Sequence, residues 1–236
     1  MILASVALAA SPGGFRLGPG VPTHMAGVRA VAAVDPDERE IYMAVPRAQF
    51  VVGRGRFDVE LPVVVLNDGR EAFTAVDLGQ LRLGAKWGWR VREAYHAAGI
   101  ELGVPVAPRS LRAYAWGSIA RETVPAFDVM LAWEGAFFPD HPLVVRLAAG
   151  WEGGDVYGPQ PRFEAALAQV VPVAGRFSLV GEAEALVDDT PVSARVLGRL
   201  DPSSRLSFDL GVQLPIVELV EEGPLVEVVG QVRGFF

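Results

Sequence analysis

The feature that most constrains this chain is a strict alternation of apolar and polar side chains with a period of two residues. Between residues 205 and 216 every even position is apolar, whereas Ser207, Asp209 and Gln213 occupy odd positions. Successive side chains of a β-strand point to opposite faces, whereas a helix would scatter both sets around its circumference. This segment is therefore predicted to be a strand with one apolar and one polar face.

The same alternation recurs along most of the chain and predicts an all-β fold. Residues 162–173 could form an amphipathic helix on composition, but Pro172 and the strong strands on either side favour a strand. Residues 91–98 are interpreted as a turn that leads into a strand. The other predicted strands are 25–34, 41–52, 57–65, 80–90, 98–106, 127–137, 143–152, 176–187, 191–200, 205–216 and 225–236. The total is about 12 strands, each near the roughly 9–11 residues that a tilted membrane strand requires.

The connections between these strands alternate between tight and long. Tight turns are predicted at 53–56, 139–142, 174–176 and 201–204, and longer connections at 67–74, 107–125, 152–161 and 218–224. Bacterial outer-membrane barrels have short periplasmic turns, longer outer loops and an even number of strands. A further strand hidden within 107–125 would change that parity. The predicted fold is a closed antiparallel up-and-down transmembrane β-barrel of about 12 strands.

Composition supports strands over helices as the membrane-crossing element. Hydrophobic residues make up 51% of the chain and the mean hydropathy is +0.30. Charges nevertheless interrupt the sequence every few residues, so no stretch approaches the roughly 18 apolar residues of a membrane-spanning helix. A barrel accommodates both observations, because one face of each strand contacts lipid and the other faces a polar interior.

The alternation divides the charged and the large apolar residues between two faces. An arginine or lysine facing lipid costs about 2–4 kcal/mol at the bilayer midplane, so the ionic face is predicted to point inward. Arg90 and Arg205 fall on that face. The other residues predicted to line the lumen are Asp58, Glu60, Arg82, Lys86, Glu101, Asp128, Glu134, Arg146, Glu182, Glu184, Arg195, Arg199, Asp209, Gln231 and Arg233. The residues predicted to face lipid are Leu206, Phe208, Leu210, Val212, Leu214, Trp133 and Trp87.

Both ends of the chain carry features of exported barrels. Residues 1–10 resemble the end of a secretory signal, with a short apolar run and small residues at Ala7 and Ala9. A first buried strand is the alternative for this stretch. The last predicted strand ends on Phe236, which resembles the terminal signal by which bacterial barrel-assembly machinery recognises its clients. Residues 11–236 are accordingly predicted to form a single β-barrel domain.

Residues 57–90 resemble a known family. The segments FDVELPV at 57–63 and TAVDLGQLRLGAKW at 74–87 are similar to motifs of a transporter family named after the MetA phenol-degradation pathway. Val76 stands before Asp77 where that family usually has glycine. Shorter similarities occur at 101–105 and 213–215. The resemblance implies an outer-membrane barrel whose cargo is unknown.

Several function classes are disfavoured by what the sequence lacks. A net charge of −7 without a basic stripe argues against a nucleic-acid partner. There is no cysteine, and His24, His96 and His141 are each interpreted as solvated turn residues outside any known catalytic or metal-binding motif. No catalytic residue, cofactor site or metal site is predicted, and the chain is not expected to be an enzyme.

The sequence thus favours a passive outer-membrane channel or transporter for small solutes, with a mixed-charge lumen. Outer-membrane lipid, the barrel-assembly machinery and an unidentified small solute are the expected partners. The same interior is equally compatible with a second hypothesis, a structural barrel whose salt-bridged interior conducts little. A soluble β-barrel or β-sandwich binding protein is the first alternative, because alternation alone does not distinguish apolar-out from apolar-in. A lipid-modifying outer-membrane enzyme is the second, less favoured because it requires a histidine beside a serine near the outer rim.

Overall fold

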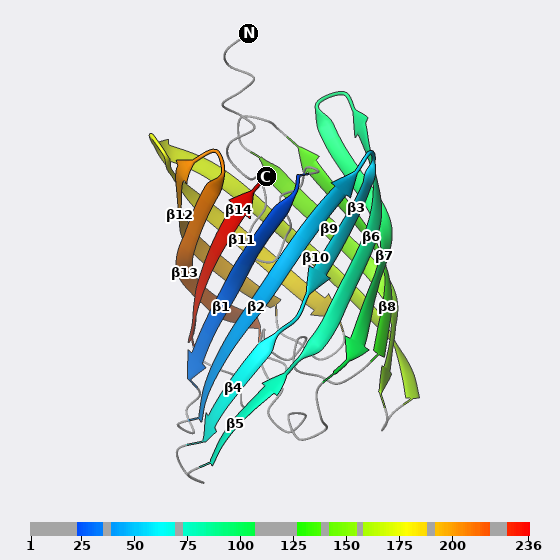
Figure 1. Cartoon of the computed structure of the whole chain (residues 1–236), viewed down its shortest axis with the longest axis vertical. Helices are drawn as coiled ribbons and strands as arrows, with labels where there is room; N and C mark the ends of the chain where they lie inside the picture. Colours follow the sequence, from blue (N-terminus) through cyan, green and yellow to red (C-terminus); the bar gives the residue numbers. More distant parts are fainter. Residues whose placement is uncertain are drawn as a thin grey trace.

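The chain forms a closed antiparallel β-barrel (Figure 1). The structure, a computed structural model, describes residues 23–34, 39–68, 73–106, 127–137, 142–154, 158–187, 192–217 and 226–236. The predicted residues 1–10 and the connection 107–125 lie outside these ranges. No helix within the described ranges is long and apolar enough to cross a membrane.

Fourteen strands make up the described part of the chain. The first seven are β1 (Met25–Val34), β2 (Arg39–Val52), β3 (Gly55–Glu60), β4 (Val63–Asp68), β5 (Phe73–Leu78), β6 (Gln80–Val91) and β7 (Ala94–Pro105). The others are β8 (Phe127–Phe137), β9 (Leu143–Gly154), β10 (Gly158–Ala174), β11 (Phe177–Val187), β12 (Val192–Ser203), β13 (Leu206–Val217) and β14 (Val226–Phe235). Neighbours along the chain pair antiparallel from β6 to β14, and β1 closes the wall by pairing with both β14 and β2.

These fourteen strands form twelve wall strands, because two wall strands are each interrupted once. β3 and β4 both pair with β2 in one continuous register and are separated only by Leu61 and Pro62. Proline has no N–H to donate to the ladder, which accounts for the break at Pro62. On the facing wall strand, β5 and β6 are separated by Gly79, and this strand has one residue more than its partner at the break. The N–H of Gly79 donates to the carbonyl of Pro62 (2.8 Å). The predicted closed barrel of about 12 antiparallel strands is therefore confirmed, and residues 162–173 lie in a strand, β10.

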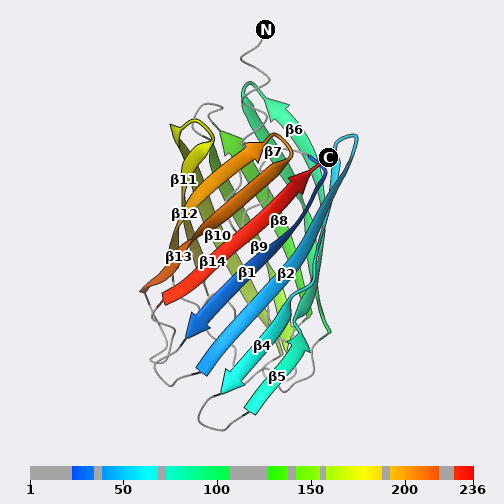
Figure 2. The same cartoon turned by 60° about the vertical axis from the view of Figure 1, so that its left-hand side comes forward.

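Tight turns gather at one end of the barrel, together with the C-terminus (Figure 2). Two residues join β2 to β3, β6 to β7, β10 to β11 and β12 to β13. Such turns favour residues with positive φ, and Gly53 (φ 59°), Gly175 (φ 55°) and Arg92 (φ 55°) supply it. Apart from the connection between β8 and β9, the remaining connections join strand ends on the opposite side of the barrel.

Several predicted boundaries near these turns were wrong. Arg56 belongs to β3 and not to a turn, and of the predicted turn 91–98 only Arg92 and Glu93 form the turn, because β6 ends at Val91 and β7 begins at Ala94. β12 extends through Ser203, which leaves Ser204 and Arg205 as the turn. Arg205 is therefore exposed in a turn and does not lie on the inner face. Each error places a turn too early or too long, because a two-residue turn leaves little local signal.

The inner face contains one apolar row between ionic rows. Following directly paired residues from β10 to β4, this apolar row consists of Val170, Val180, Leu197, Gly211, Val229, Val31, Met43 and Val64. Its seven side chains are at most 4% exposed. Two residues away along each strand lies a row of polar side chains on either side of the apolar row. One of these rows contains the paired residues Glu182, Arg195, Gln213 and Glu227, and the other contains Ser178, Arg199, Asp209, Gln231 and Arg29. The interior is thus layered chemically, with charge on both sides of an apolar layer.

Candidate functional site

The candidate site is the barrel interior, where the charged side chains meet. Ion pairs join strands that are not neighbours in the wall, such as β3 to β8 and β7 to β9, so these side chains reach across the enclosed space. Eleven of the fifteen residues predicted to line a lumen are buried. The other four, Asp58, Glu60, Arg82 and Glu101, are half-buried. Their role as the lining of a conduit stays a prediction.

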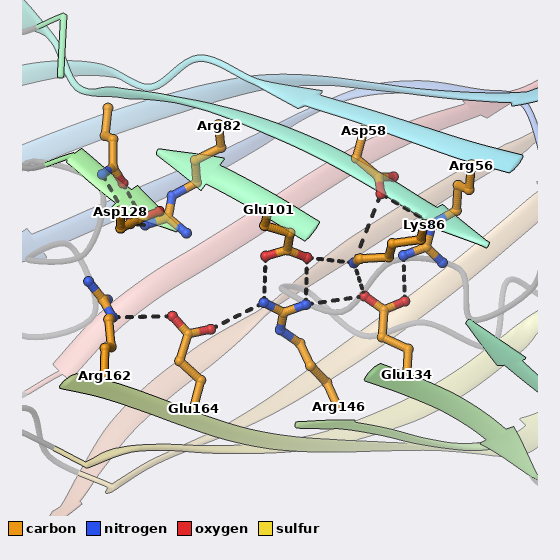
Figure 3. A network of polar contacts seen from close by, with 11 residues as sticks. Arg56, Asp58, Arg82, Lys86, Glu101, Asp128, Glu134, Arg146, Arg162 and Glu164 are labelled. Atoms are coloured by element: carbon orange, nitrogen blue, oxygen red, sulfur yellow. Dashed lines mark hydrogen bonds and ion pairs between the residues drawn. The ribbon is translucent and has the colours of Figure 1, made fainter. Parts of the chain in front are cut away.

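The largest network is centred on Arg146 of β9 and Glu134 of β8 (Figure 3). Arg146 donates two parallel hydrogen bonds to Glu101, both 2.6 Å long, and lies 3.3 Å from carboxylate oxygens of Glu134 and Glu164. Glu134 also accepts from Arg56 at 2.5 Å and from Lys86. Bidentate and charge-assisted bonds of this kind are the stronger hydrogen bonds in proteins. This network therefore fixes β3, β6, β7, β8, β9 and β10 to one another from inside.

One extension and one neighbouring group carry charge farther along the wall. Arg162 of β10 pairs with Glu164 (3.3 Å) and with Glu152 of β9. Beside the network lies a group on β6 and β8, in which Arg82 donates to Gln80 (2.7 Å) and the amide nitrogen of Gln80 donates to Asp128 (3.0 Å). The charged groups thus extend over β6 to β10 without a large excess of either sign.

Two further clusters lie on the wall formed by β11 to β14, one on each side of the apolar row. Arg195 lies 3.1 Å from Glu182 and 2.8 Å from Glu184 and also donates to Gln213. Asp209 accepts two bonds from Arg199 (2.7 and 3.1 Å) and one from Arg233 (2.6 Å). All these guanidinium groups are buried, so their carboxylate partners offset the cost of removing charge from water.

A small cavity remains beside the central network. Its volume is about 80 Å³, which is room for a few water molecules. Its charged lining residues are Arg29, Arg47, Arg56, Arg82, Lys86, Arg146, Asp58, Glu60, Glu101, Asp128 and Glu134. The cavity therefore has charged groups of both signs in its lining, and several of them take part in the ion pairs of the central network.

The outer face is apolar and exposed. Among the residues predicted to face lipid, Phe208, Leu210, Val212, Leu214 and Trp87 are exposed, with Leu210 at 68%, and Leu206 and Trp133 are half-buried. Trp133 is partly covered because His96 stacks between it (5.8 Å between ring centroids) and Trp89 (5.7 Å).

Neither of the two histidines within the described residues lies in the charged interior. His96 lies in β7 within this outer aromatic stack and is not a solvated turn residue, which corrects its predicted place. His24 is exposed before β1, and His141 lies outside the described ranges. The described residues also hold no group of three or more histidine, aspartate or glutamate side chains placed to bind a metal.

Several interior charges were missed by the sequence reasoning. Arg56 was placed in a turn because Gly53 and Gly55 come shortly before it, although it is 1% exposed and contacts Glu134. Arg29, Arg47 and Glu164 lie in the segments with the weakest alternation. A signal for Glu164 existed, since Arg162 and Glu164 share the parity expected of one strand face.

Solved structures of low sequence identity share this fold. An outer-membrane channel from Pseudomonas putida F1 is 13% identical with a TM-score of 0.61, and the match covers 92% of this chain and 96% of that one. The NanC porin (8% identity, TM-score 0.58) matches over 89% of this chain and 99% of its own. The KdgM porin in complex with disordered oligogalacturonate (8%, TM-score 0.54) matches over the same shares.

Other comparisons give no family. No family model matches the chain, and no curated protein matches it. Identities this low establish a common barrel fold, and the resemblance to the MetA-pathway transporter family stays a prediction.

Proposed function

We propose that this protein is an outer-membrane β-barrel whose mixed-charge interior forms a narrow passive channel for small polar solutes. The observation that carries the proposal is the division of the closed wall into an exposed apolar outer face and a buried ionic inner face. A water-soluble barrel of this size would normally show the opposite division.

The outer face supports a membrane environment on energetic grounds. Leu131 and Leu147 on the paired strands β8 and β9, and Val196, Leu210 and Val228 on β12 to β14, are 51–68% exposed. Monomeric soluble proteins rarely expose continuous apolar surface of this extent, whereas in a bilayer such a band contacts hydrocarbon. Aromatic residues lie toward both ends of the wall, with Phe50, Phe57, Phe177 and Phe208 near the tight turns and Phe127 and Trp151 near the opposite end. This is the distribution expected of interfacial girdles.

The interior supports a channel of limited width. The cavity of about 80 Å³ has six basic and five acidic residues in its lining, so it suits small polar solutes of either charge better than large or apolar ones. Widening it requires side chains such as Arg146 and Lys86 to exchange partners. We therefore expect small conductance that depends on individual ion pairs.

The comparisons support the same class. The similar solved structures are described as an outer-membrane channel and as porins, and the sequence motifs at 57–63 and 74–87 resemble a transporter family.

The first test asks whether the protein is a membrane barrel at all. The chain is refolded into lipid vesicles and its electrophoretic mobility in SDS is compared before and after boiling. A folded barrel resists unboiled SDS and shifts on boiling. Unchanged mobility, together with solubility in buffer without detergent, would transfer the assignment to a soluble β-barrel.

The second test asks whether the interior conducts. Single-channel currents in planar bilayers are compared for the unmodified chain, Arg82→Gln and the double variant Arg146→Met/Glu101→Gln. Arg82→Gln removes one lining base and is expected to shift selectivity toward cations. The double variant removes a bidentate pair without changing the net charge and is expected to raise conductance. Absence of current in all three chains would favour a structural barrel with a salt-bridged interior.

A further inference from the structure

Four arginines occupy the four two-residue turns at the tight-turn end of the barrel. They are Arg54 between β2 and β3, Arg92 between β6 and β7, Arg176 between β10 and β11, and Arg205 between β12 and β13. All four side chains are exposed. The only acidic residue in these turns is Glu93. We call this set the arginine rim.

The backbone of the arginine rim is held in place by neighbouring strands. The carbonyl of Arg54 accepts from Gly88 (2.8 Å), that of Arg176 from Asp201 (3.0 Å), and that of Arg205 from Phe235 (2.9 Å). Arg92 keeps a positive φ of 55°, a conformation that most residues other than glycine avoid. The arginines are therefore presented at fixed positions around the barrel end, on short turns that bring them close to the wall.

Outward-facing aromatic side chains follow the arginine rim along the wall. Phe57, Phe177 and Phe208 are the nearest on three of the hairpins and are 39–47% exposed. On the fourth, Trp89 and His96 stack on each other at 5.7 Å. Aromatic rings favour the boundary between hydrocarbon and headgroups, so this order places the arginines at the level of the lipid headgroups. This step rests on the proposed membrane function.

The sequence that connects the strand ends on the opposite side has the reverse balance of charge. The connections that the topology places there contain four arginines, Arg70, Arg109, Arg112 and Arg121, against eleven acidic residues. These acidic residues are Asp35, Asp37, Glu38, Glu71, Glu122, Asp155, Asp188, Asp189, Glu218, Glu221 and Glu222. The connection between β8 and β9, which joins strand ends on the tight-turn side, adds Asp140, so arginines outnumber acidic residues in the connections of that side and acidic residues outnumber arginines in those of the other.

We infer that the arginine rim binds the phosphate groups of anionic phospholipids in the leaflet at the tight-turn end. Arginine matches phosphate oxygens through two parallel N–H groups, which favours it over lysine for this contact. Basic residues at a membrane surface contribute about 1 kcal/mol each toward anionic lipid. One arginine beside one lipid then corresponds to a preference of about fivefold over a zwitterionic lipid. Periplasmic turns of bacterial barrels are the short ones, so the leaflet concerned is the inner one.

The test measures lipid preference next to the barrel by tryptophan quenching. The full chain, carrying Trp116→Phe and Trp151→Phe, is refolded into vesicles containing brominated phosphatidylglycerol or brominated phosphatidylcholine. Trp87, Trp89 and Trp133 then report on the surrounding lipid. We expect phosphatidylglycerol to be preferred about fivefold, and the variant Arg54→Gln/Arg92→Asn/Arg176→Gln/Arg205→Gln to lose most of that preference. Asparagine is used at position 92 because it tolerates a positive φ.

A matched control separates the rim from overall charge. The variant Arg70→Gln/Arg109→Gln/Arg112→Gln/Arg121→Gln removes the same charge from the opposite end and is expected to keep the preference. The inference is overturned if both variants lose the preference for phosphatidylglycerol equally, or if the chain with the unmodified rim shows no such preference. If the unmodified chain shows no lipid preference and yet binds inorganic phosphate, which the variant with all four rim arginines replaced does not, the rim binds free phosphate ion and the lipid assignment is wrong.

Failure of this inference is distinguishable from failure of the membrane proposal. Equal quenching by both lipids, in a chain whose mobility still shifts on boiling, leaves the membrane barrel standing and removes the rim site. Absence of quenching by either lipid contradicts the membrane proposal itself.

Discussion

Replacing Arg146 with methionine is expected to destabilise the barrel more than any change at an exposed arginine. Arg146 is 7% exposed and lies within 3.3 Å of Glu101, Glu134 and Glu164. Methionine keeps much of the apolar stem but removes the guanidinium group. Three carboxylates in a buried site then lose one shared cation.

The expected cost can be worked out from the remaining partners. Removing one member of a buried ion pair typically costs about 3–5 kcal/mol, because the other charge stays buried. Here Glu101 keeps Lys86 at 2.5 Å and Glu134 keeps Arg56 at 2.5 Å, which favours the lower end of that range. We expect a loss of about 3 kcal/mol in the free energy of unfolding, a change of roughly a hundredfold in the folding equilibrium.

A double-mutant cycle identifies the cause. Glu101→Gln removes the bidentate partner, so the double variant Arg146→Met/Glu101→Gln is expected to cost about 1–2 kcal/mol less than the sum of the single changes. Denaturant unfolding in vesicles, followed by tryptophan fluorescence, measures each value. Arg205→Met, at an exposed turn, serves as the control and, in vesicles of zwitterionic lipid only, is expected to change stability by less than about 0.5 kcal/mol. The reasoning is refuted if Arg146→Met resembles this control, or if the two single costs simply add.

Three other changes test separate parts of the structure. Leu210→Arg places a charge on the outer face and is expected to cost about 2–4 kcal/mol in vesicles, whereas a soluble barrel would tolerate it within about 0.5 kcal/mol; denaturant unfolding decides. Gly88→Ala would place its Cβ only 1.7 Å from Oη of Tyr95, so we expect a loss of about 1–3 kcal/mol from overpacking. Adding Tyr95→Ala to that chain should remove this steric cost, and a purely additive result would contradict it. Phe236→Ala is expected to lower the amount of heat-modifiable barrel in cells while leaving refolding into vesicles unchanged, because Phe236 is 81% exposed and contributes little packing; equal amounts in cells would argue against an assembly signal.

The strands could be predicted from the sequence because their signal is local. In β13 the residue type alone indicates which face each side chain occupies, since Phe208, Leu210 and Val212 alternate with Ser207, Asp209 and Gly211. The same signal disappears in β1 and β2, where inward Val31, Met43 and Val45 are as apolar as their outward neighbours. The apolar row was therefore missed, because it appears only when residues from eight strands are placed side by side.

The ion pairs could not be predicted from the sequence for a related reason. Arg146 and Glu101 belong to strands separated by β8, and Arg56 and Glu134 to strands separated by β6 and β7. Alternation predicts that such residues share the interior, but which charge meets which depends on strand tilt and on the curvature of the wall. Boundaries such as that of β3 failed because Gly53 and Gly55 are equally compatible with a longer turn.

The chemical layering of the inner face also restricts how the wall can be assembled. Sliding a strand by one residue exchanges its faces and exposes its charges to lipid, but sliding it by two keeps every side chain on its proper face. Such a two-residue slip of β12 against β11 would bring Leu197 opposite Ser178 or Glu182 and would set an arginine opposite Val180. Because ionic and apolar layers succeed each other along the strands, only one alignment satisfies both. The order of ionic and apolar side chains inside the barrel thus selects one register among several that would keep the same faces inward during assembly.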